Sequence, residues 1–318
     1  MKPLLIYLDQ NKWIDLTRAY HNLPKGAPYR VILEQIQTAI KNGTAICPLS
    51  ASHVIETRKV PEVDHRKRVA QVMVEVSQGW IMAPADYVVP KEMEVAIAKV
   101  FRDRISPPPS ALGRGIPFAF NQSENLHLDL GISKVESERL QVRLDTPKTL
   151  LQFLVGHDES INLNGVSNFT NRSLVFVERI EKARQLGRNY SKFVRKRAYV
   201  ANLTFSLQTD LQRILDQNGK TIDDFLDIGK SRLMSFFGMI PTLDVEIELA
   251  TERDDFWNRQ IDPNDMADIG FLSVAIPYCD IVVTERFWCD LAKRKKLDQK
   301  YNTILLNDVL QLEQYLGS

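Results

Sequence analysis

Strand–helix pairs occur at both ends of this chain with long helical stretches between them, and this arrangement constrains the fold more than any other feature. Near the start, residues Leu4–Leu8 form a short apolar run, typical of a buried parallel strand, and residues 10–21 have a helical pattern. Near the end, residues 281–284 and 303–306 have the same strand pattern, with a helical pattern over 287–295 between them. We therefore expect one α/β domain whose parallel sheet is built from both chain ends.

The rest of the pattern predicts a helical insertion between the two halves of that domain. In chain order we expect a helix over 29–41, a strand over 45–48, a helix from Ser50 or Ser52 through Glu56, a strand within 81–90, and helices over 134–154, 171–215, 222–237 and 265–275. The proline-rich stretch 106–115 cannot continue a helix and is expected to be a surface loop. The predicted domains are thus 1–90 with 240–318, forming the discontinuous α/β domain, and 91–239, a helical subdomain for substrate or partner binding.

Composition excludes several classes of protein. The chain has 318 residues, 44% of them hydrophobic and 25% charged, which is enough to bury a sizeable core and argues against disorder. Its formal net charge of +1 does not indicate a generic polyanion-binding protein, so any nucleic-acid surface has to be a local patch. The three cysteines form no CxxC pair, and their odd number suits a reducing compartment. The sequence contains no run of about 18 apolar residues, the length that a membrane-spanning helix needs. We therefore expect a cytoplasmic protein without a membrane partner.

Acidic residues lie where predicted strands lead into helices. In an open parallel sheet, ligands bind beyond the carboxyl ends of the strands, so acids at these positions are informative. The candidates are Asp9, Glu56, Asp265, Asp268 and Glu285. Carboxylate oxygens suit Mg²⁺ and Mn²⁺, and the set lacks the Cys and His residues expected of a zinc site. The sequence therefore predicts a carboxylate site for Mg²⁺ or Mn²⁺.

Each of these acids also has an ordinary structural interpretation. Asp9 and Asp265 lie at predicted helix starts, where Asp is a common N-cap residue. Glu56 is typical of a solvated helix surface, and the spacing of Asp265 and Asp268 is common at helix starts. Glu285 next to a basic residue is compatible with a weak surface ion pair. Taken alone, no acid decides between the two interpretations.

Three segments taken together resemble the PIN-domain nuclease family. They are LIYLDQNKWIDL at the start, LSASHVIET in the middle and NDMADIGFLSVAIPYCDIVVTERFW near the end. In that family an N-terminal strand ends in Asp, a segment of small residues leads to a helical Glu, and a helix carrying Asp precedes a strand that ends at a Thr–acid turn. The resemblance implies a PIN-like three-layer fold, with Asp9, Glu56 and Asp268 as the three core acids and Asp265 as an additional catalytic residue.

The sequence departs from the family after the last of these strands. The family commonly has an acid two residues after the threonine, whereas this chain has Arg286 there and Glu285 one residue earlier. Either Glu285 serves as a metal ligand through a shift of the turn, or the fourth carboxylate is missing. Asn11 and Thr284 are candidates for orienting a ligand or a bound water by their polar side chains.

The activity that the resemblance implies is hydrolysis of phosphodiester bonds by a metal-dependent endonuclease, with RNA as the expected substrate. Cations held by the carboxylates would activate a water for in-line attack and stabilise the leaving oxygen. Two other hypotheses stay open, namely a catalytically degenerate PIN-like module that binds nucleic acid or protein, and a hydrolase of small phosphate esters. The sequence is compatible with a homo-oligomer or a regulatory protein partner and does not decide between them.

A basic segment in the predicted insertion is a candidate surface for nucleic acid. Its cations, interleaved with aromatic residues, include Arg184, Arg188, Lys192, Arg195 and Lys196. Cations on such a surface neutralise phosphates, and exposed aromatic rings stack on unpaired bases. The alternative is a charged outer helix face whose aromatic residues point into the core.

Overall fold

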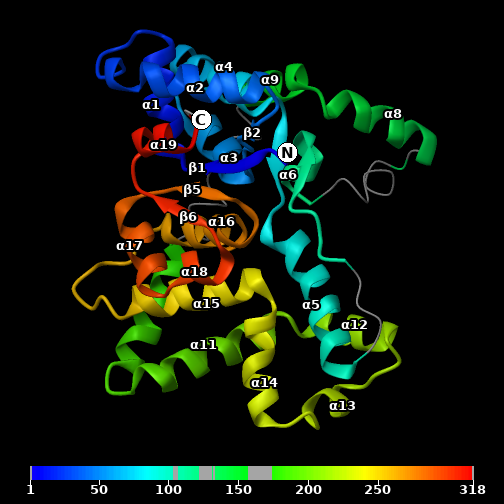
Figure 1. Ribbon diagram of the computed structural model, residues 1–318. Coiled ribbons are helices and arrows are strands. Elements are labelled where there is room, and N and C mark those ends of the chain that lie inside the picture. Colours follow the sequence, from blue (N-terminus) through cyan, green and yellow to red (C-terminus); the bar gives the residue numbers. More distant parts are fainter. Residues whose placement is uncertain (1, 103–106, 122–130, 132, 157–173, 317–318) are drawn as a thin grey trace. The chain divides into compact units, whose positions relative to one another are not determined.

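The computed structural model is a mixed α/β structure that divides into two compact units (Figure 1). It describes residues 2–102, 107–121, 131, 133–156 and 174–316. The first unit, here called the sheet unit, comprises Met1–Pro84, Ala111–Phe169 and Tyr278–Ser318. The second, here called the helical unit, comprises Ala85–Ser110 and Thr170–Pro277.

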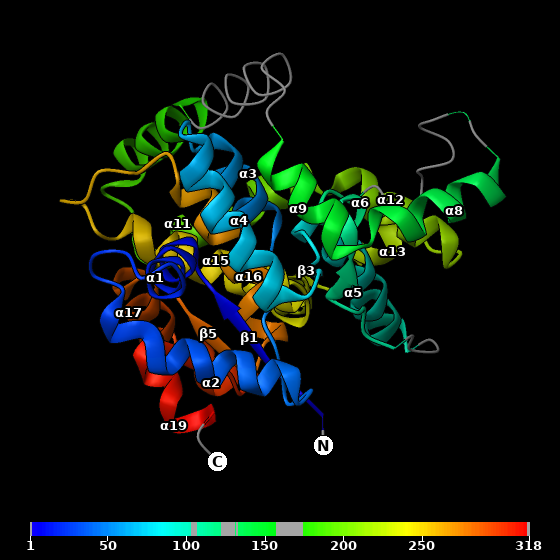
Figure 2. The same ribbon diagram turned by 90° about the horizontal axis from the view of Figure 1, so that it is seen from above.

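The sheet unit is built on four parallel strands in the order β2-β1-β5-β6. These strands are β1 (Leu4–Leu8), β2 (Ala45–Ile46), β5 (Ile281–Val283) and β6 (Ile304–Leu306). β1 and β5 pair directly, with Leu8 aligned to Val283, and lie side by side in Figures 1 and 2. Segments from the two chain ends therefore form the centre of one parallel sheet, which confirms the predicted α/β class.

The connections leave the two central strands in opposite directions across the sheet. From β1 the chain passes through α1 (Gln10–Tyr20) and α2 (Arg30–Lys41) to β2 on one side. From β5 it passes through α17 (Arg286–Arg294) and α18 (Leu297–Tyr301) to β6 on the other side. Such a reversal is a topological switch point, and open parallel sheets bind ligands beyond the carboxyl ends of the strands that flank it. The residues that follow β1 and β5 therefore occupy the expected ligand position of this sheet.

The remaining elements of the sheet unit include a second, antiparallel pair of strands. In chain order the elements are η1 (Ala27–Tyr29), α3 (Ala51–Lys59), α4 (Val63–Ser77), β3 (Trp80–Met82), β4 (Leu112–Arg114), α6 (Gly115–Ala119), α8 (Lys134–Leu144), α9 (Pro147–Val155), η3 (Val309–Leu312) and α19 (Glu313–Leu316). β3 pairs with β4, so the prediction of a loop is wrong for the three residues of β4. Only the start of the strand expected within 81–90 is extended, since a helix begins at Ala85.

The helical unit contains long helices around its own apolar core. In chain order its elements are α5 (Ala85–Phe101), a helix over 174–187, α11 (Lys192–Ser206), α12 (Gln208–Gln217), α13 (Ile222–Leu226), α14 (Lys230–Phe236), η2 (Phe237–Met239), α15 (Pro241–Asp254) and α16 (Asp265–Tyr278). Buried side chains such as Met93, Ile97, Ile214, Phe236 and Leu243 form this core. Each contributes about 1.5–3 kcal/mol relative to leaving it exposed.

The bounds of the two units differ from those of the predicted domains. Residues 111–169, expected in the insertion, belong to the sheet unit, and residues 240–277, expected in the α/β domain, belong to the helical unit. The helix expected over 171–215 is divided into three helices, and its first residues, 171–173, lie outside the described residues. Within the part of the chain that the structure describes, no helix combines the length and the apolar composition needed to cross a membrane.

Candidate functional site

Asp9 lies directly after β1 and is the N-cap residue of α1. Its backbone amide donates to the carbonyl of Val283 at 2.9 Å, which ties it to β5. One carboxylate oxygen, Oδ1, accepts from the amide of Gln10 at 2.7 Å, and Oδ2 accepts from the hydroxyl of Thr284 at 3.2 Å. Burial raises the pKa of Asp9 even though these donors favour the charged form. Ionisation of this capping carboxylate therefore costs more free energy than it would in water.

Glu56 lies on α3, the helix that follows β2, and is partly buried rather than solvated. Burial and the nearby carboxylate of Asp9 raise its pKa from 4.5 to about 7. Lys59 acts in the opposite direction, and Glu285 raises the pKa further. Glu56 therefore lies close enough to Asp9 and to the exposed Glu285 for both carboxylates to disfavour its charged form.

The turn after β5 directs Glu285, and not Arg286, toward the other acids. The side-chain amide of Asn11 donates to Oε1 of Glu285 at 2.7 Å, which links this turn to the start of α1. The side chain of Arg286 is 85% exposed, and its Nε lies 3.7 Å from a carboxylate oxygen of Asp290 one turn along α17. The turn after β5 thus places the carboxylate of Glu285 beside Asn11 at the start of α1, while the side chain of Arg286 lies along α17.

The two acids of α16 lie in the helical unit, where the first is held by an arginine. Both guanidinium nitrogens Nη1 and Nη2 of Arg259 lie 2.6 Å from the carboxylate oxygens of Asp265, which is only 1% exposed. The backbone amide of Asp262 also donates to Asp265, at 3.2 Å. Asp268 is partly exposed one turn later, and its charge helps to raise the pKa of Arg259. These contacts give Asp265 a structural role at the start of α16.

The structure thus separates the predicted site residues into two groups. Within the sheet unit it brings together Asp9, Asn11, Glu56, Thr284 and Glu285. Asp265 and Asp268 share one helix start in the helical unit. Among the described residues, no three His, Cys, Asp or Glu side chains are grouped closely enough to hold a metal ion by themselves.

Sequence reasoning missed a buried polar group that stands beside these acids. The hydroxyl of Tyr7 is hydrogen-bonded to the side chains of Ser50 and Ser52, and burial followed by the charge of Asp9 raises its pKa well above 10. The Tyr7 ring stacks on His53 at 5.3 Å, and burial lowers the pKa of that imidazole to about 3, so it is neutral. A signal for this group exists in the sequence, because residues two apart on a strand share one face of the sheet. Tyr7 and Asp9 have that spacing.

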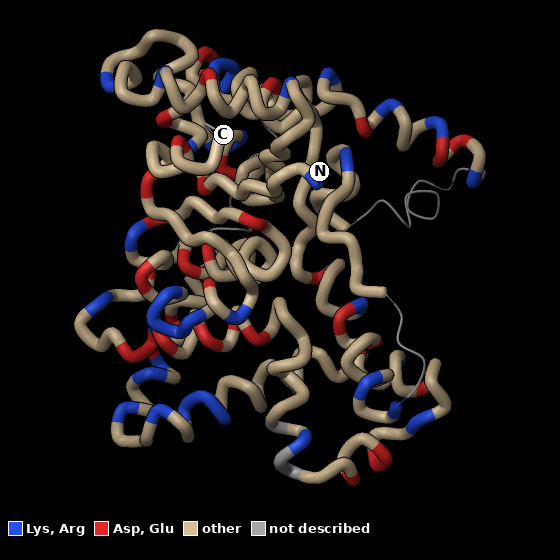
Figure 3. Tube along the Cα trace, in the orientation of Figure 1, with Lys and Arg blue, Asp and Glu red and all other residues tan. Residues whose placement is uncertain are grey.

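The predicted nucleic-acid surface is largely a set of ion pairs inside the helical unit. Arg184 is only 5% exposed, and its guanidinium donates to the carbonyls of Phe256 and Arg259 at 2.7 and 3.0 Å. The pairs along α11 are Lys192 with Glu252 and Asp255, Arg195 with Asp255, and Lys196 with Glu248. Figure 3 shows these basic positions of α11 beside the acidic positions of α15. Four of the five predicted cations therefore have a structural partner.

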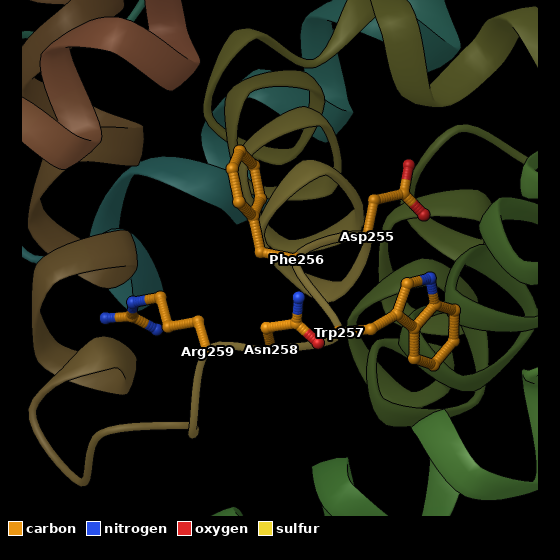
Figure 4. A pocket seen from close by; sticks show the side chains of 5 residues that line it. All are labelled: Asp255, Phe256, Trp257, Asn258 and Arg259. Carbon is orange, nitrogen blue, oxygen red and sulfur yellow. The ribbon is translucent and has the colours of Figure 1, made fainter.

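The loop over residues 255–259 contributes both to the ion pairs of α11, through Asp255, and to the ion pair at the start of α16, through Arg259. Figure 4 shows Asp255 and Trp257 pointing to one side of the loop and Arg259 to the other. On the first side, the guanidinium carbon of Arg195 lies 5.2 Å from the centre of the Trp257 ring, a cation–π contact. On the second side, Arg259 holds the start of α16. Of the aromatic residues in the basic segment, Tyr190 and Phe193 are exposed, whereas Tyr199 packs against the core of the helical unit, so the alternative of inward-pointing aromatic residues holds for Tyr199 and not for the other two.

We expect the ion pair between Lys196 and Glu248 to stabilise the helical unit. Lys196→Glu should lower the free energy of unfolding by about 1–3 kcal/mol, between the values for exposed and buried pairs. Adding Glu248→Lys should restore most of that loss, because the exchange rebuilds the pair with reversed charges. Urea unfolding of the three proteins measures both effects. Arg188→Glu, at an exposed position in the turn before α11, is the control that should change stability little. Unchanged stability in Lys196→Glu would leave the cations of α11 free to serve as a binding surface.

Comparison of the chain with protein-family models, with curated proteins and with solved structures found no match. Its function therefore has to be inferred from its own residues and their geometry. Within the sheet unit, Asp9 and Glu285 follow the carboxyl ends of two paired parallel strands, and both carboxylates raise the pKa of Glu56. Polar side chains orient the carboxylates of Asp9 and Glu285.

Proposed function

We propose that this protein is an Mg²⁺-dependent or Mn²⁺-dependent endonuclease that hydrolyses phosphodiester bonds in RNA. The carboxylates of Asp9, Glu56 and Glu285 would hold the cation at the carboxyl ends of β1 and β5. One observation carries the proposal: at the switch point of the sheet, Glu56 has its pKa raised to about 7 by burial, by Asp9 and by Glu285. A protein gains nothing in stability from such repulsion, whereas acidic groups with perturbed pKa values are typical of functional sites.

The donor set fits a hard divalent cation better than any other common metal. All three groups are carboxylates, although among the described residues no three His, Cys, Asp or Glu side chains lie close enough together to hold a metal ion by themselves. A ready-made cage of three protein ligands is not needed for Mg²⁺, because this ion keeps several waters and binds through one or two carboxylates together with substrate phosphates. A cation would also offset the mutual repulsion of the acids.

Polar side chains next to the acids can position them for this role. Gln10 and Thr284 donate to the two oxygens of Asp9 and so hold its carboxylate in one orientation. Glu56 has a pKa of about 7 in the metal-free protein, so a cation would compete with a proton for this carboxylate near neutral pH. When bound, a divalent cation supplies acidification of a water and stabilisation of the leaving oxygen.

The two acids of the helical unit are not among the three carboxylates assigned here. Asp268 is expected as a ligand only from the resemblance to PIN-domain nucleases, and it belongs to a different unit of the fold. Asp265 is left out, because both of its oxygens are bound by Arg259 and its side chain is buried. The non-catalytic alternative rests on Arg286 in the fourth acidic place, and the side chain of this residue is exposed and lies near Asp290.

A cleavage assay tests the proposal and separates it from its rivals. The full chain is incubated with mixed RNA, with single-stranded DNA and with a mononucleotide phosphate ester, each in Mn²⁺ and in EDTA. We expect internal cleavage of RNA in Mn²⁺ that EDTA stops and that Asp9→Asn lacks. Hydrolysis of the ester alone would indicate a phosphatase-like enzyme. Binding of RNA without any cleavage would indicate the degenerate module.

A further inference from the structure

A buried polar network joins the first strand of the sheet to the helix that carries Glu56. The hydroxyl of Tyr7, on β1, is hydrogen-bonded to the side chains of Ser50 and Ser52. The two serine hydroxyls lie 2.9 Å apart, and the backbone amide of Ser50, the N-cap residue of α3, donates to Nδ1 of His53 at 3.0 Å. The ring of His53 stacks on that of Tyr7. Tyr7 therefore contacts the first turn of α3 through both its hydroxyl and its ring.

Burial makes this network a restraint on the position of α3. The side chains of Tyr7, Ser50, Ser52 and His53 are each at most 7% exposed. A hydroxyl that loses its partner in such surroundings is not compensated by water, so the hydrogen bonds are costly to break. Buried networks of this kind fix the relative position of the elements that they join.

The two elements that this network joins also position Asp9 and Glu56. Asp9 follows Tyr7 by two residues in extended backbone, a step of roughly 6–7 Å. Glu56 follows Ser52 by four residues on α3, a step of about 6 Å along the same helix face. Asp9 lies near enough to Glu56 to disfavour its charged form, so without a cation their own interaction does not hold these carboxylates together. The contacts of Tyr7 supply a restraint that does.

We propose that Tyr7 is a positioning residue of the metal site, which holds α3 against β1 so that Asp9 and Glu56 stay at a separation that one divalent cation can bridge. This role rests on the proposed metal-dependent function. Tyr7 does not itself bind the cation, because its buried hydroxyl is bonded to the two serines. Removal of a group that orients metal ligands commonly lowers metal affinity by roughly 10–100-fold.

Calorimetric titration of Mn²⁺ into the full chain carrying Tyr7→Phe tests this role. The substitution keeps the ring that stacks on His53 and removes only the hydroxyl, and we expect it to lower the affinity for Mn²⁺ about tenfold. Ser52→Ala, which removes one partner of that hydroxyl, should also lower the affinity. Tyr20→Phe is the matched control, because the hydroxyl of Tyr20 donates to Glu75 at 2.7 Å at the other end of α1 from the acids. It should bind Mn²⁺ as the wild type does.

The same titration in the Glu56→Gln background separates positioning of Glu56 from a general disturbance of the fold. There, adding Tyr7→Phe should change the affinity by less than about twofold, because the ligand that Tyr7 positions is already altered. Circular dichroism should show that each variant is folded.

The possible results distinguish this role from the proposed function. Wild-type affinity in both Tyr7→Phe and Ser52→Ala would overturn the role of Tyr7 and leave the metal site in place. A loss in the Glu56→Gln background as large as in the wild-type background would also overturn it, because Tyr7 would then act on the site without acting through Glu56. Absence of Mn²⁺ binding in the wild type would contradict the proposed function itself, and the role of Tyr7 with it.

Discussion

Replacing Asp9 by Asn, or Glu56 by Gln, is expected to reduce Mn²⁺-dependent cleavage of RNA by at least about 100-fold, which corresponds to about 2.7 kcal/mol of transition-state stabilisation. Each change removes one negative charge from the three that face the switch point of the sheet. The side chains keep their size and most of their hydrogen-bonding capacity, so the loss would come from the missing charge. Initial rates of cleavage of one RNA at saturating Mn²⁺ measure the effect.

Asp290→Asn is the matched control for these two variants. Asp290 lies on α17 in the same unit, is exposed, and contacts Arg286 rather than the acids of the site. It should retain nearly all activity, while circular dichroism should show that all three variants are folded. Activity near that of the wild type in Asp9→Asn would remove the proposed site.

Glu56→Gln is expected to stabilise the metal-free protein, and to do so only above pH 5. The pKa of Glu56 is about 7 in the folded chain and has its usual value of 4.5 in the unfolded chain. Below pH 4.5 the carboxyl is protonated in both states and folding carries no penalty from it. As the pH rises from 4.5 to 7 the unfolded chain loses this proton first, so wild-type stability falls, and above pH 7 the penalty is complete.

The expected size of this penalty follows from the shift in pKa. A difference of this size is worth roughly 3 kcal/mol at most, and the Glu56→Gln variant is free of the penalty because its side-chain amide does not titrate. Urea unfolding in EDTA at pH 5 and at pH 8 should therefore show a gain for the variant that is several times larger at pH 8. Glu138→Gln, at an exposed position of α8, should show no such dependence. An equal gain in the free energy of unfolding at both pH values would contradict the raised pKa of Glu56.

Much of the sheet could be predicted because its strands are short apolar runs with an acid or a threonine at the end. Leu4–Leu8 and the run before Thr284 pair directly in the structure, although 275 residues separate Ile6 from Ile281. Helix boundaries next to these strands agree with the pattern to within one or two residues. A strand that is buried on both faces appears in the sequence as a continuous apolar run, and these two strands are buried in that way.

The antiparallel pair of β3 and β4 could not be predicted, because its second strand looks like a loop. Gly113 at its centre is a residue that usually weakens a strand. In the structure a Cβ at this position would lie 2.6 Å from ring atoms of Phe118, so the close approach of that ring requires glycine. A preference that arises from a tertiary contact leaves no periodic signal in the sequence.

Partners that are distant in sequence explain the differences at the predicted site. Lys196 looks like a phosphate-binding residue until Glu248 is placed beside it, 52 residues later in the chain. Asp265 resembles a ligand at a helix start, whereas Arg259, six residues before it, occupies both of its oxygens. Spacings of 52 and six residues are not the three or four residues that bring side chains together on one helix face. Helical periodicity in the sequence therefore does not predict either pair. The direction of the Glu285 side chain likewise depends on a distant residue, because Asn11 at the start of α1 donates to its carboxylate.

Calorimetric titration of Mn²⁺ into the full chain tests the central claim most directly. The carboxylate site of the sheet unit predicts saturable binding in the wild type, a loss of affinity of at least about tenfold in Asp9→Asn and in Glu285→Gln, and no change in Arg286→Ala. An affinity that is unchanged in Asp9→Asn, or that rises only in Arg286→Ala, would contradict it.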